Sequence, residues 1–248
     1  MKRIVLLLFL TASVATGAGS SGAAKLIGSI TGKSAEPRPI KSGGNIYDLV
    51  TGKNLFTIEA EIKPTNEGQM FFSSRYLDAD NKEAMTEEAY YNQMKLQKYT
   101  LKQTQLNEVY ELNVNDKKMT FTIQKNGATK AVTKVAPENL LVGPSFVPFL
   151  QKHWKEITSS KKVKANLAVM DYMDTLGFEF EMMDSGDVRG ITVRMRPTNV
   201  IISAVVNPIY FLVQNDGAKI LELKGPMLVK LKVGNSWEDF DGRAVFTY

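Results

Sequence analysis

Apolar and polar residues alternate along most of the chain after residue 46. In Thr57 to Lys63 the even positions are apolar and the odd positions are polar. This period of two is typical of a strand that buries one face and exposes the other. The same alternation marks 176–182 and 191–196. Further strands are predicted at 209–213, 219–223, 228–233 and 244–248.

Turn residues separate some of these strands. Residues 109–114 and 119–123 flank the polar stretch Asn115–Lys118 and are predicted to form a hairpin. Asn126-Gly127 is a second turn signal, because both positions of a tight hairpin turn favour residues that tolerate a positive φ. Residues 82–93 follow neither the strand period nor the helix period, so their structure stays open.

One segment has helical spacing instead. Between Ser145 and Ile157, residues at i, i+3, i+4, i+7, i+8 and i+11 line one face and polar residues lie opposite. The residues of this face are Phe146, Phe149, Leu150, His153, Trp154 and Ile157. A second, short helix is predicted over 199–206, closed by Asn207-Pro208.

Many strands and few helices favour one antiparallel sheet. The amphipathic helix needs an apolar surface to cover, and the concave face of a curved sheet offers one. The sequence therefore predicts a mainly β fold: a strongly curved antiparallel sheet or open barrel, with the amphipathic helix packed on its concave face.

The N-terminus has the layout of a secretory signal peptide. Lys2 and Arg3 precede the apolar run Ile4–Leu10, and Ala15-Thr16-Gly17 supplies small residues for cleavage. The apolar run is far shorter than the ~20 residues that span a bilayer. We therefore expect a signal peptide over 1–19, no transmembrane segment after its cleavage, and a periplasmic or secreted location.

The rest of the chain divides into two parts. Residues 20–45 are rich in Gly, Ser, Ala and Pro without a sustained period, and are predicted to be a flexible linker. Residues 46–248 contain no later stretch of linker composition and no internal repeat, so they are predicted to form a single β-rich domain.

Cysteine and charge narrow the classes of function. The chain has no cysteine, which excludes thiol catalysis and Cys-ligated metals, and export without disulfides favours a bacterial envelope. The net charge of +5 comes from scattered residues rather than from a basic stripe with interleaved aromatics, so nucleic acid is not an expected partner.

The inventory of catalytic motifs is sparse. His153 is the only histidine, so a Ser-His-Asp triad or a histidine metal site would have to include it. No Gly-x-Ser-x-Gly elbow, phosphate loop or dinucleotide fingerprint is present. Glu179 and Glu181 fit a solvated strand face, and the acidic residues of 238–241 fit an acidic turn. No catalytic residue, metal or cofactor is predicted.

Several short stretches resemble a family of uncharacterised exported bacterial proteins. They include Asn45–Asp48, Gly52–Phe56, Arg75–Asp78, Val142–Phe149 and Met195–Asn199. This resemblance implies no activity and no site residues. The expected architecture is also similar to that of LolA-type half-barrel carriers, which are exported and have helices plugging a concave apolar face.

Three functions stay open. In the first, the protein binds a hydrophobic small molecule or lipid against the apolar helix face, with Phe146, Phe149, Leu150, His153 and Trp154 as ligand-binding residues. In the second, it is a structural or interaction protein of the envelope whose sheet is filled by its own side chains. The third, a hydrolase, is disfavoured by the missing motifs. Cavity volume separates the first two, because ligand pockets measure ~300 Å³ or more.

Overall fold

The computed structural model describes residues 39–64, 68–183 and 186–248. These residues form a 15-stranded sheet and a separate two-stranded hairpin. The strand order of the large sheet is β8-β7-β6-β5-β4-β3-β2-β1-β17-β14-β13-β12-β11-β10-β9. All neighbouring strands are antiparallel except β9 and β10. The mainly β fold with one large antiparallel sheet is confirmed.

The N-terminal part of the sheet is a meander in which each strand pairs with the next. Its strands are β1 (Ile40–Asp48), β2 (Asn54–Pro64), β3 (Gln69–Leu77), β4 (Glu83–Asn92), β5 (Lys95–Gln103), β6 (Glu108–Asn115), β7 (Lys118–Lys125) and β8 (Ala128–Val135). The 3-10 turn η1 (Thr104–Leu106) joins β5 to β6. Asn126 and Gly127 both have a positive φ between β7 and β8, so the predicted turn is confirmed.

The second part of the sheet carries the helices. Its strands are β9 (Leu140–Leu141), β10 (Val163–Val169), β11 (Asp174–Met183), β12 (Ile191–Pro197), β13 (Ile209–Val213), β14 (Ile220–Pro226) and β17 (Asp241–Thr247). The turns and helices are η2 (Gly143–Ser145), α2 (Phe146–Thr158), η3 (Met170–Tyr172) and α3 (Val200–Ser203). Strand β17 pairs with both β1 and β14, and so joins the two parts.

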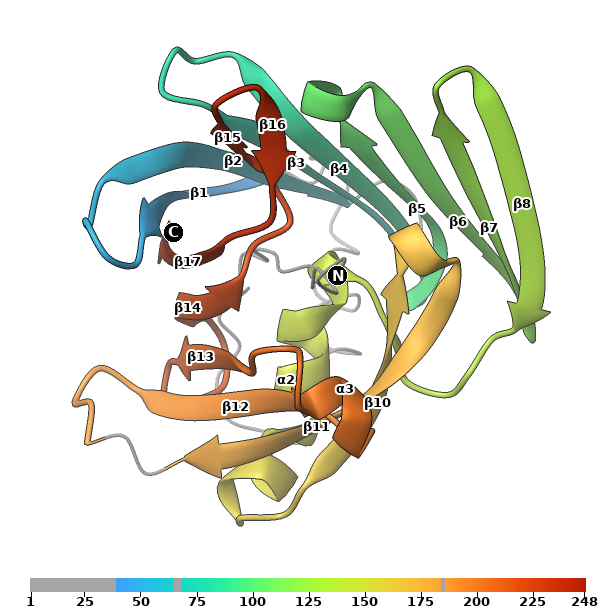
Figure 1. Cartoon of the computed structure of the whole chain (residues 1–248). Helices are drawn as coiled ribbons and strands as arrows, with labels where there is room; N and C mark the ends of the chain where they lie inside the picture. The colour runs from blue at the N-terminus through green and yellow to red at the C-terminus, as the bar shows by residue number, and fades with distance from the viewer. Residues whose placement is uncertain (1–38, 65–67, 184–185) are drawn as a thin grey trace, which may run out of the picture.

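The sheet curves strongly but does not close, because β8 and β9 stand at opposite ends of the strand order. Strands β1 to β8 form one side of the curve and β10 to β13 the other, with α2 between them (Figure 1). Lys134 on β8 reaches Asp174 on β11 across the gap, with Nζ and Oδ2 2.6 Å apart. The open barrel with a helix on its concave face is confirmed.

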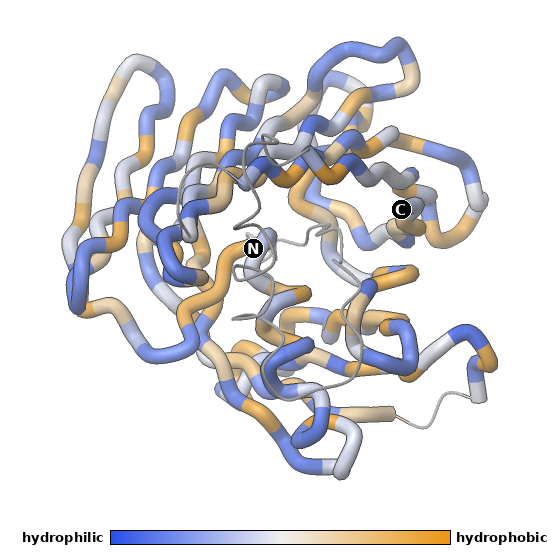
Figure 2. Tube along the Cα trace, turned by 180° about the vertical axis from the view of Figure 1, so that it is seen from behind, coloured by the Kyte–Doolittle hydropathy of each residue, from blue (hydrophilic) through white to orange (hydrophobic). Residues whose placement is uncertain are grey.

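Alternation places one face of the strands in the core. Orange and blue segments alternate along the strands in Figure 2, as a period of two requires. Tyr99, Phe121, Phe178 and Phe211 are fully buried on the concave side. The same core takes up the apolar face of α2, so strands from both parts of the sheet and the helix share one hydrophobic cluster.

Two sequence boundaries need correction. The predicted linker ran to residue 45, but β1 begins at Ile40 and pairs with β2 and β17 on both sides. Backbone hydrogen bonds hold this Gly-rich stretch in the sheet. Such bonds do not require alternating apolar side chains, so the sequence pattern gave no sign of the strand. The predicted strand at 228–233 is β15 (Leu231–Val233) alone. The signal peptide and residues 20–38 lie outside the described residues.

The structure also shows the conformation of the segment whose pattern was ambiguous and of the second predicted helix. Residues 82–93, left open by their pattern, contain strand β4. The short helix predicted over 199–206 is the four-residue α3, and the Asn199 side chain accepts hydrogen bonds from the amides of Ile201 and Ile202 at its start. None of the helices in the described part of the chain is long and apolar enough to cross a membrane.

Residues 227–240 connect β14 to β17 and form what we call the strap. Its first residues, Met227, Leu228 and Val229, are buried in the core, and its outer part is the exposed hairpin of β15 and β16 (Ser236–Glu238). Gln103 at the end of β5 and Gln105 in η1 hold it. Gln103 donates to the Leu228 carbonyl at 3.0 Å, and Gln105 donates to the Lys230 carbonyl at 3.0 Å.

Candidate functional site

The five residues predicted to bind a ligand lie together on α2, in two different environments. Phe146, Phe149 and Leu150 are buried against the sheet. The Phe149 ring lies 4.9 Å from that of Phe180 on β11, and the Phe146 ring lies 5.5 Å from that of Phe211 on β13. Such tilted contacts between rings are typical of a packed aromatic core. The three residues therefore dock the helix.

His153 and Trp154 lie at the edge of this contact. The His153 ring packs 4.8 Å from that of Phe149, and its Nδ1 lies 2.9 Å from Oε1 of Glu156 one turn on. Its Nε2 is buried and has no hydrogen-bond partner among the described residues. Trp154 donates from Nε1 to the Asn215 carbonyl at 3.0 Å, which ties α2 to the turn between β13 and β14.

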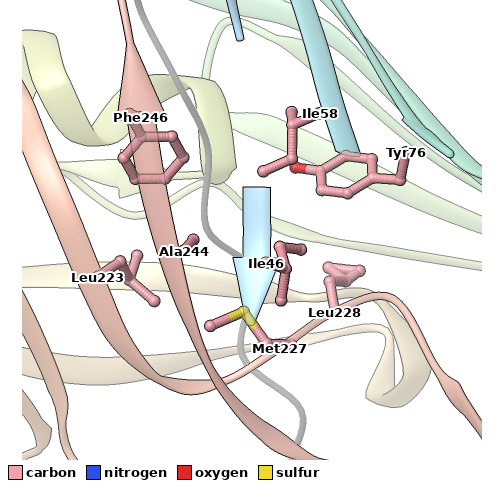
Figure 3. A pocket seen from close by; sticks show the side chains of 8 residues that line it. All are labelled: Ile46, Ile58, Tyr76, Leu223, Met227, Leu228, Ala244 and Phe246. Carbon is pink, nitrogen blue, oxygen red and sulfur yellow. The ribbon is translucent and has the colours of Figure 1, made fainter. Parts of the chain in front are cut away.

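A small apolar cavity lies elsewhere on the concave face. The side chains around this cavity come from β1, β2, β3, β14, β17 and the strap: Ile46, Ile58, Tyr76, Leu223, Met227, Leu228, Ala244 and Phe246. In Figure 3 Ile58 and Tyr76 lie on one side, with Leu223, Ala244 and Phe246 opposite. The cavity volume is only 10 Å³, about that of a single water position. None of the five predicted residues lines it.

Next to this cavity lies a buried polar cluster that the sequence did not reveal. Glu87 on β4 is fully buried and accepts hydrogen bonds from Tyr99 on β5 and from Ser74 on β3, the latter at 3.2 Å. Burial raises the pKa of Glu87 well above its ordinary value, against the effect of hydrogen bonds from Tyr99, Ser74 and Tyr76. The buried site therefore favours the protonated form of Glu87 over its carboxylate.

The carboxylate pair on β11 belongs to an ion-pair network on the outer face. Glu181 lies 3.5 Å from Arg196 and 3.8 Å from Lys162, and it also pairs with Arg194. Partial burial opposes ionisation of Glu179, but hydrogen bonds from Arg196 and Lys162 lower its pKa below the ordinary value. Both acids thus lie in ion pairs with basic side chains on the outer face of the strand.

The acidic residues near the C-terminus are also paired. Asp239 pairs with Lys230 and Asp241 accepts from Asn207 at 2.6 Å. The described residues contain no cluster of three or more His, Asp or Glu side chains placed to hold a metal ion. Nothing in the described site or in the comparisons supports the hydrolase alternative.

Comparisons with known proteins do not assign this chain to a family or give it a function. No family model matches the chain, and no curated protein matches it. The chain superposes on a β-barrel-like protein of the domain of unknown function DUF1849 from Brucella abortus with a TM-score of 0.47 and 7% identity, over 84% of this chain and 95% of that one.

Two further solved structures are less similar. Rv2717c from M. tuberculosis gives a TM-score of 0.24 at 10% identity, over 84% of this chain and 89% of that one. A porin-like protein from Bacteroides uniformis gives 0.23 at 9% identity, over 84% of this chain and 96% of that one. All three scores are low, so the function is argued from this chain's own residues. The resemblances to an exported family and to LolA-type carriers stay predictions.

Proposed function

We propose that this protein is a non-enzymatic binding protein of the bacterial envelope, with a packed β core and with its partner contacts on the outside. One observation carries the proposal. The apolar cavity on the concave face, where a half-barrel carrier would hold its ligand, measures 10 Å³. Ligand pockets measure ~300 Å³ or more, whereas packed cores leave few voids larger than a water.

The location rests on the sequence of the N-terminus. Lys2 and Arg3, the apolar run Ile4–Leu10 and the small residues of Ala15-Thr16-Gly17 support export through a cleaved signal peptide. The proposed location is the periplasm or the exterior of a bacterial cell. A domain without cysteine folds there without disulfides, because its core is large enough to do without them.

The charged outer face of the sheet supports the proposal that partners bind the outside of the protein. Charged side chains form ion pairs there across neighbouring strands, such as Arg75 with Glu59 at 2.6 Å and Lys98 with Glu111 at 2.7 Å. A partner bound to such a face meets a polar surface whose long-range electrostatics are screened by salt.

A second candidate function is a carrier of a hydrophobic molecule such as a lipid, and the strap favours it. Met227 and Leu228 supply part of the cavity wall, yet they belong to a connection rather than to the sheet. Displacement of the strap would uncover Ile46, Ile58 and Phe246 on the concave face. In this function the predicted residues of α2 would border the opened space.

Purification from the envelope fraction of the native host separates the two candidates. N-terminal sequencing should start near residue 18, and organic extraction followed by mass spectrometry should find no stoichiometric lipid. In the packed core Phe149→Ala should cost about 3–5 kcal/mol of unfolding free energy. Lys152→Ala, on the exposed face of the same helix, should change it little.

Two results would contradict the proposal. Bound lipid in the wild-type protein, together with a small stability loss in Phe149→Ala, would favour the carrier. An intact Met1 on protein in the cytoplasmic fraction would defeat the proposed location.

A further inference from the structure

A depression of 190 Å³ lies on the outer face of the second part of the sheet. Strands β12, β13 and β14 contribute Thr192, Tyr210, Leu212, Glu222 and Lys224, and the connection from β11 to β12 contributes Asp187 and Arg189. The intervening residues Val193, Phe211 and Leu223 are buried in the core. Alternation along each strand therefore turns the side chains of the depression outward, away from α2.

A chain of ion pairs fixes the charged groups of the depression. Arg189 binds both carboxylate oxygens of Asp187, at 3.1 and 2.7 Å, and its Nη1 lies 3.6 Å from Oε2 of Glu222. Lys224 Nζ lies 3.2 Å from Oε1 of the same Glu222. Hydrogen bonds from Arg189 lower the pKa of Asp187 to about 2, so the pair is ionised at physiological pH. Two acids and two bases thus cancel within the depression.

This cancellation decides which ligands fit. A charged ligand group would have to break an existing ion pair, which leaves the abandoned partner in a partly buried place: the Glu222 side chain is only 8% exposed. A hydroxyl group needs no such exchange. A guanidinium has five N–H donors and a carboxylate about four lone-pair sites, so paired side chains can still bond to hydroxyls. The side chains of Arg189 and Lys224 are 55% and 54% exposed and can reach such a ligand.

The aromatic side chain of the depression points to the same class of ligand. Tyr210 is 37% exposed and lies in register between Arg194 and Lys224, so its position on the sheet is fixed. An exposed ring beside fixed polar groups offers an apolar surface to the C–H face of a sugar ring. The volume is below that of pockets for drug-sized molecules, and it suits one ring rather than a long chain.

We propose that this depression binds one sugar unit of a neutral oligosaccharide. The inference deepens the proposed function and rests on it, because it names a ligand class for the outer face of the packed protein. Tyr210 supplies the stacking surface, and Arg189, Lys224, Glu222 and Thr192 supply hydrogen bonds to hydroxyl groups.

The full mature chain should be tested on an array of neutral and anionic oligosaccharides, followed by titration calorimetry with the neutral oligosaccharide that binds best. We expect saturable binding that changes little with salt, since no net charge is exchanged. Tyr210→Ala should weaken binding about tenfold or more, equivalent to at least about 1.4 kcal/mol. Thr192→Val, which keeps the shape and removes the hydroxyl, should weaken it severalfold.

Tyr90→Ala is the matched control, because Tyr90 is an outer-face tyrosine of similar exposure, 43%, on the distant strand β4. It should bind like the wild type. Thermal unfolding identifies any variant that fails to fold, and Thr192→Val carries the test if Tyr210→Ala does so. Binding to anionic oligosaccharides only, binding to none, or unchanged affinity in the folded variants would overturn the inference. Absence of lipid with no oligosaccharide bound would overturn the inference and leave the proposed function standing, whereas bound lipid would overturn the proposed function and with it the premise of the inference.

Discussion

Glu87 is a buried acid whose ionisation the fold opposes, and this makes stability depend on pH. Its pKa is raised well above the ordinary 4.5, so the folded state keeps a proton that the unfolded chain loses. The contribution to stability is fully present below the ordinary pKa and is lost as pH rises toward the raised value. Each pH unit across that window costs about 1.4 kcal/mol.

Glu87→Gln should remove this loss, since an amide keeps the shape and the hydrogen bonds of the protonated acid without titrating. Urea unfolding from pH 4 upward should show the variant gaining stability relative to the wild type as pH rises. Glu88→Gln, at the exposed neighbouring position, should run parallel to the wild type. An unchanged pH slope in Glu87→Gln would mean that Glu87 ionises in the folded protein.

Sequence patterns could predict which residues of α2 are buried but not the cluster around Glu87. Apolar residues spaced at i, i+3 and i+4 identify a helix face, and this spacing stays recognisable even when one position on the face is polar. In β4 the core-facing positions include an acid, and the register with β5 shifts between Tyr90 and Tyr91. The acid and the shift together hide the strand period. The hydrogen bonds that make Glu87 tolerable come from β3 and β5, which only the fold brings beside it.

Among the elements, α2 and the turn between β13 and β14 meet at a position that accepts only glycine. Gly217 has a φ of +76°, and a Cβ added there would lie 2.6 Å from the Trp154 ring. Gly127 has a similar φ of +74° but open space around it. Both glycines therefore need a positive φ, but only Gly217 lies against a side chain of a neighbouring element.

Gly217→Ala should destabilise the protein more than Gly127→Ala. The backbone penalty common to both is about 1–2 kcal/mol. The additional loss at Gly217 reports the clash with Trp154, so Trp154→Ala in the same chain should recover part of it. Chemical unfolding of the four variants measures this coupling. Equal losses at the two glycines, or strict additivity with Trp154→Ala, would show that the helix is not docked on this turn.

Elements with a strong period were predictable, and those without one were not. The strands at 57–63, 191–196 and 209–213 lie within β2, β12 and β13 because one face of each is apolar. Strand β8 was missed since nearly all of its residues are exposed, so no apolar face marks it. The hydrogen bonds of β8 to β7 depend on the backbone, which the side-chain pattern does not report.

At the scale of the whole molecule, the strand order could not be predicted from the sequence. Strand β17, at the end of the chain, inserts between β1 and β14 and so joins the first strand to the second part of the sheet. Alternation assigns strands and faces but carries no information about partners so far apart in sequence. Strand β1 begins at Ile40, inside the stretch predicted as linker, because it pairs with β2 from Ile40 and with β17 from Gly43.

The open barrel leaves β8 as a sheet edge in the described part of the chain. Lysines on β8 oppose the pairing of this edge with another chain. Lys134 and Lys130 pair in register with Met119 and Ile123, so they lie on the concave side of β8. Lys134 also reaches Asp174 on β11, and hydrogen bonding from Lys134 lowers the pKa of Asp174. Inward-pointing charges on an edge strand oppose pairing with another chain, because such pairing would bury them.

Replacement of both lysines by glutamine should therefore promote self-association through β8. Size-exclusion chromatography with light scattering should show oligomers whose fraction rises with protein concentration in Lys130→Gln/Lys134→Gln. Lys152→Gln/Lys155→Gln removes the same charge from the exposed face of α2 and should elute as the wild type does. Association of both variants would assign the effect to net charge, and association of neither would show that the curvature of the sheet protects β8 without its lysines.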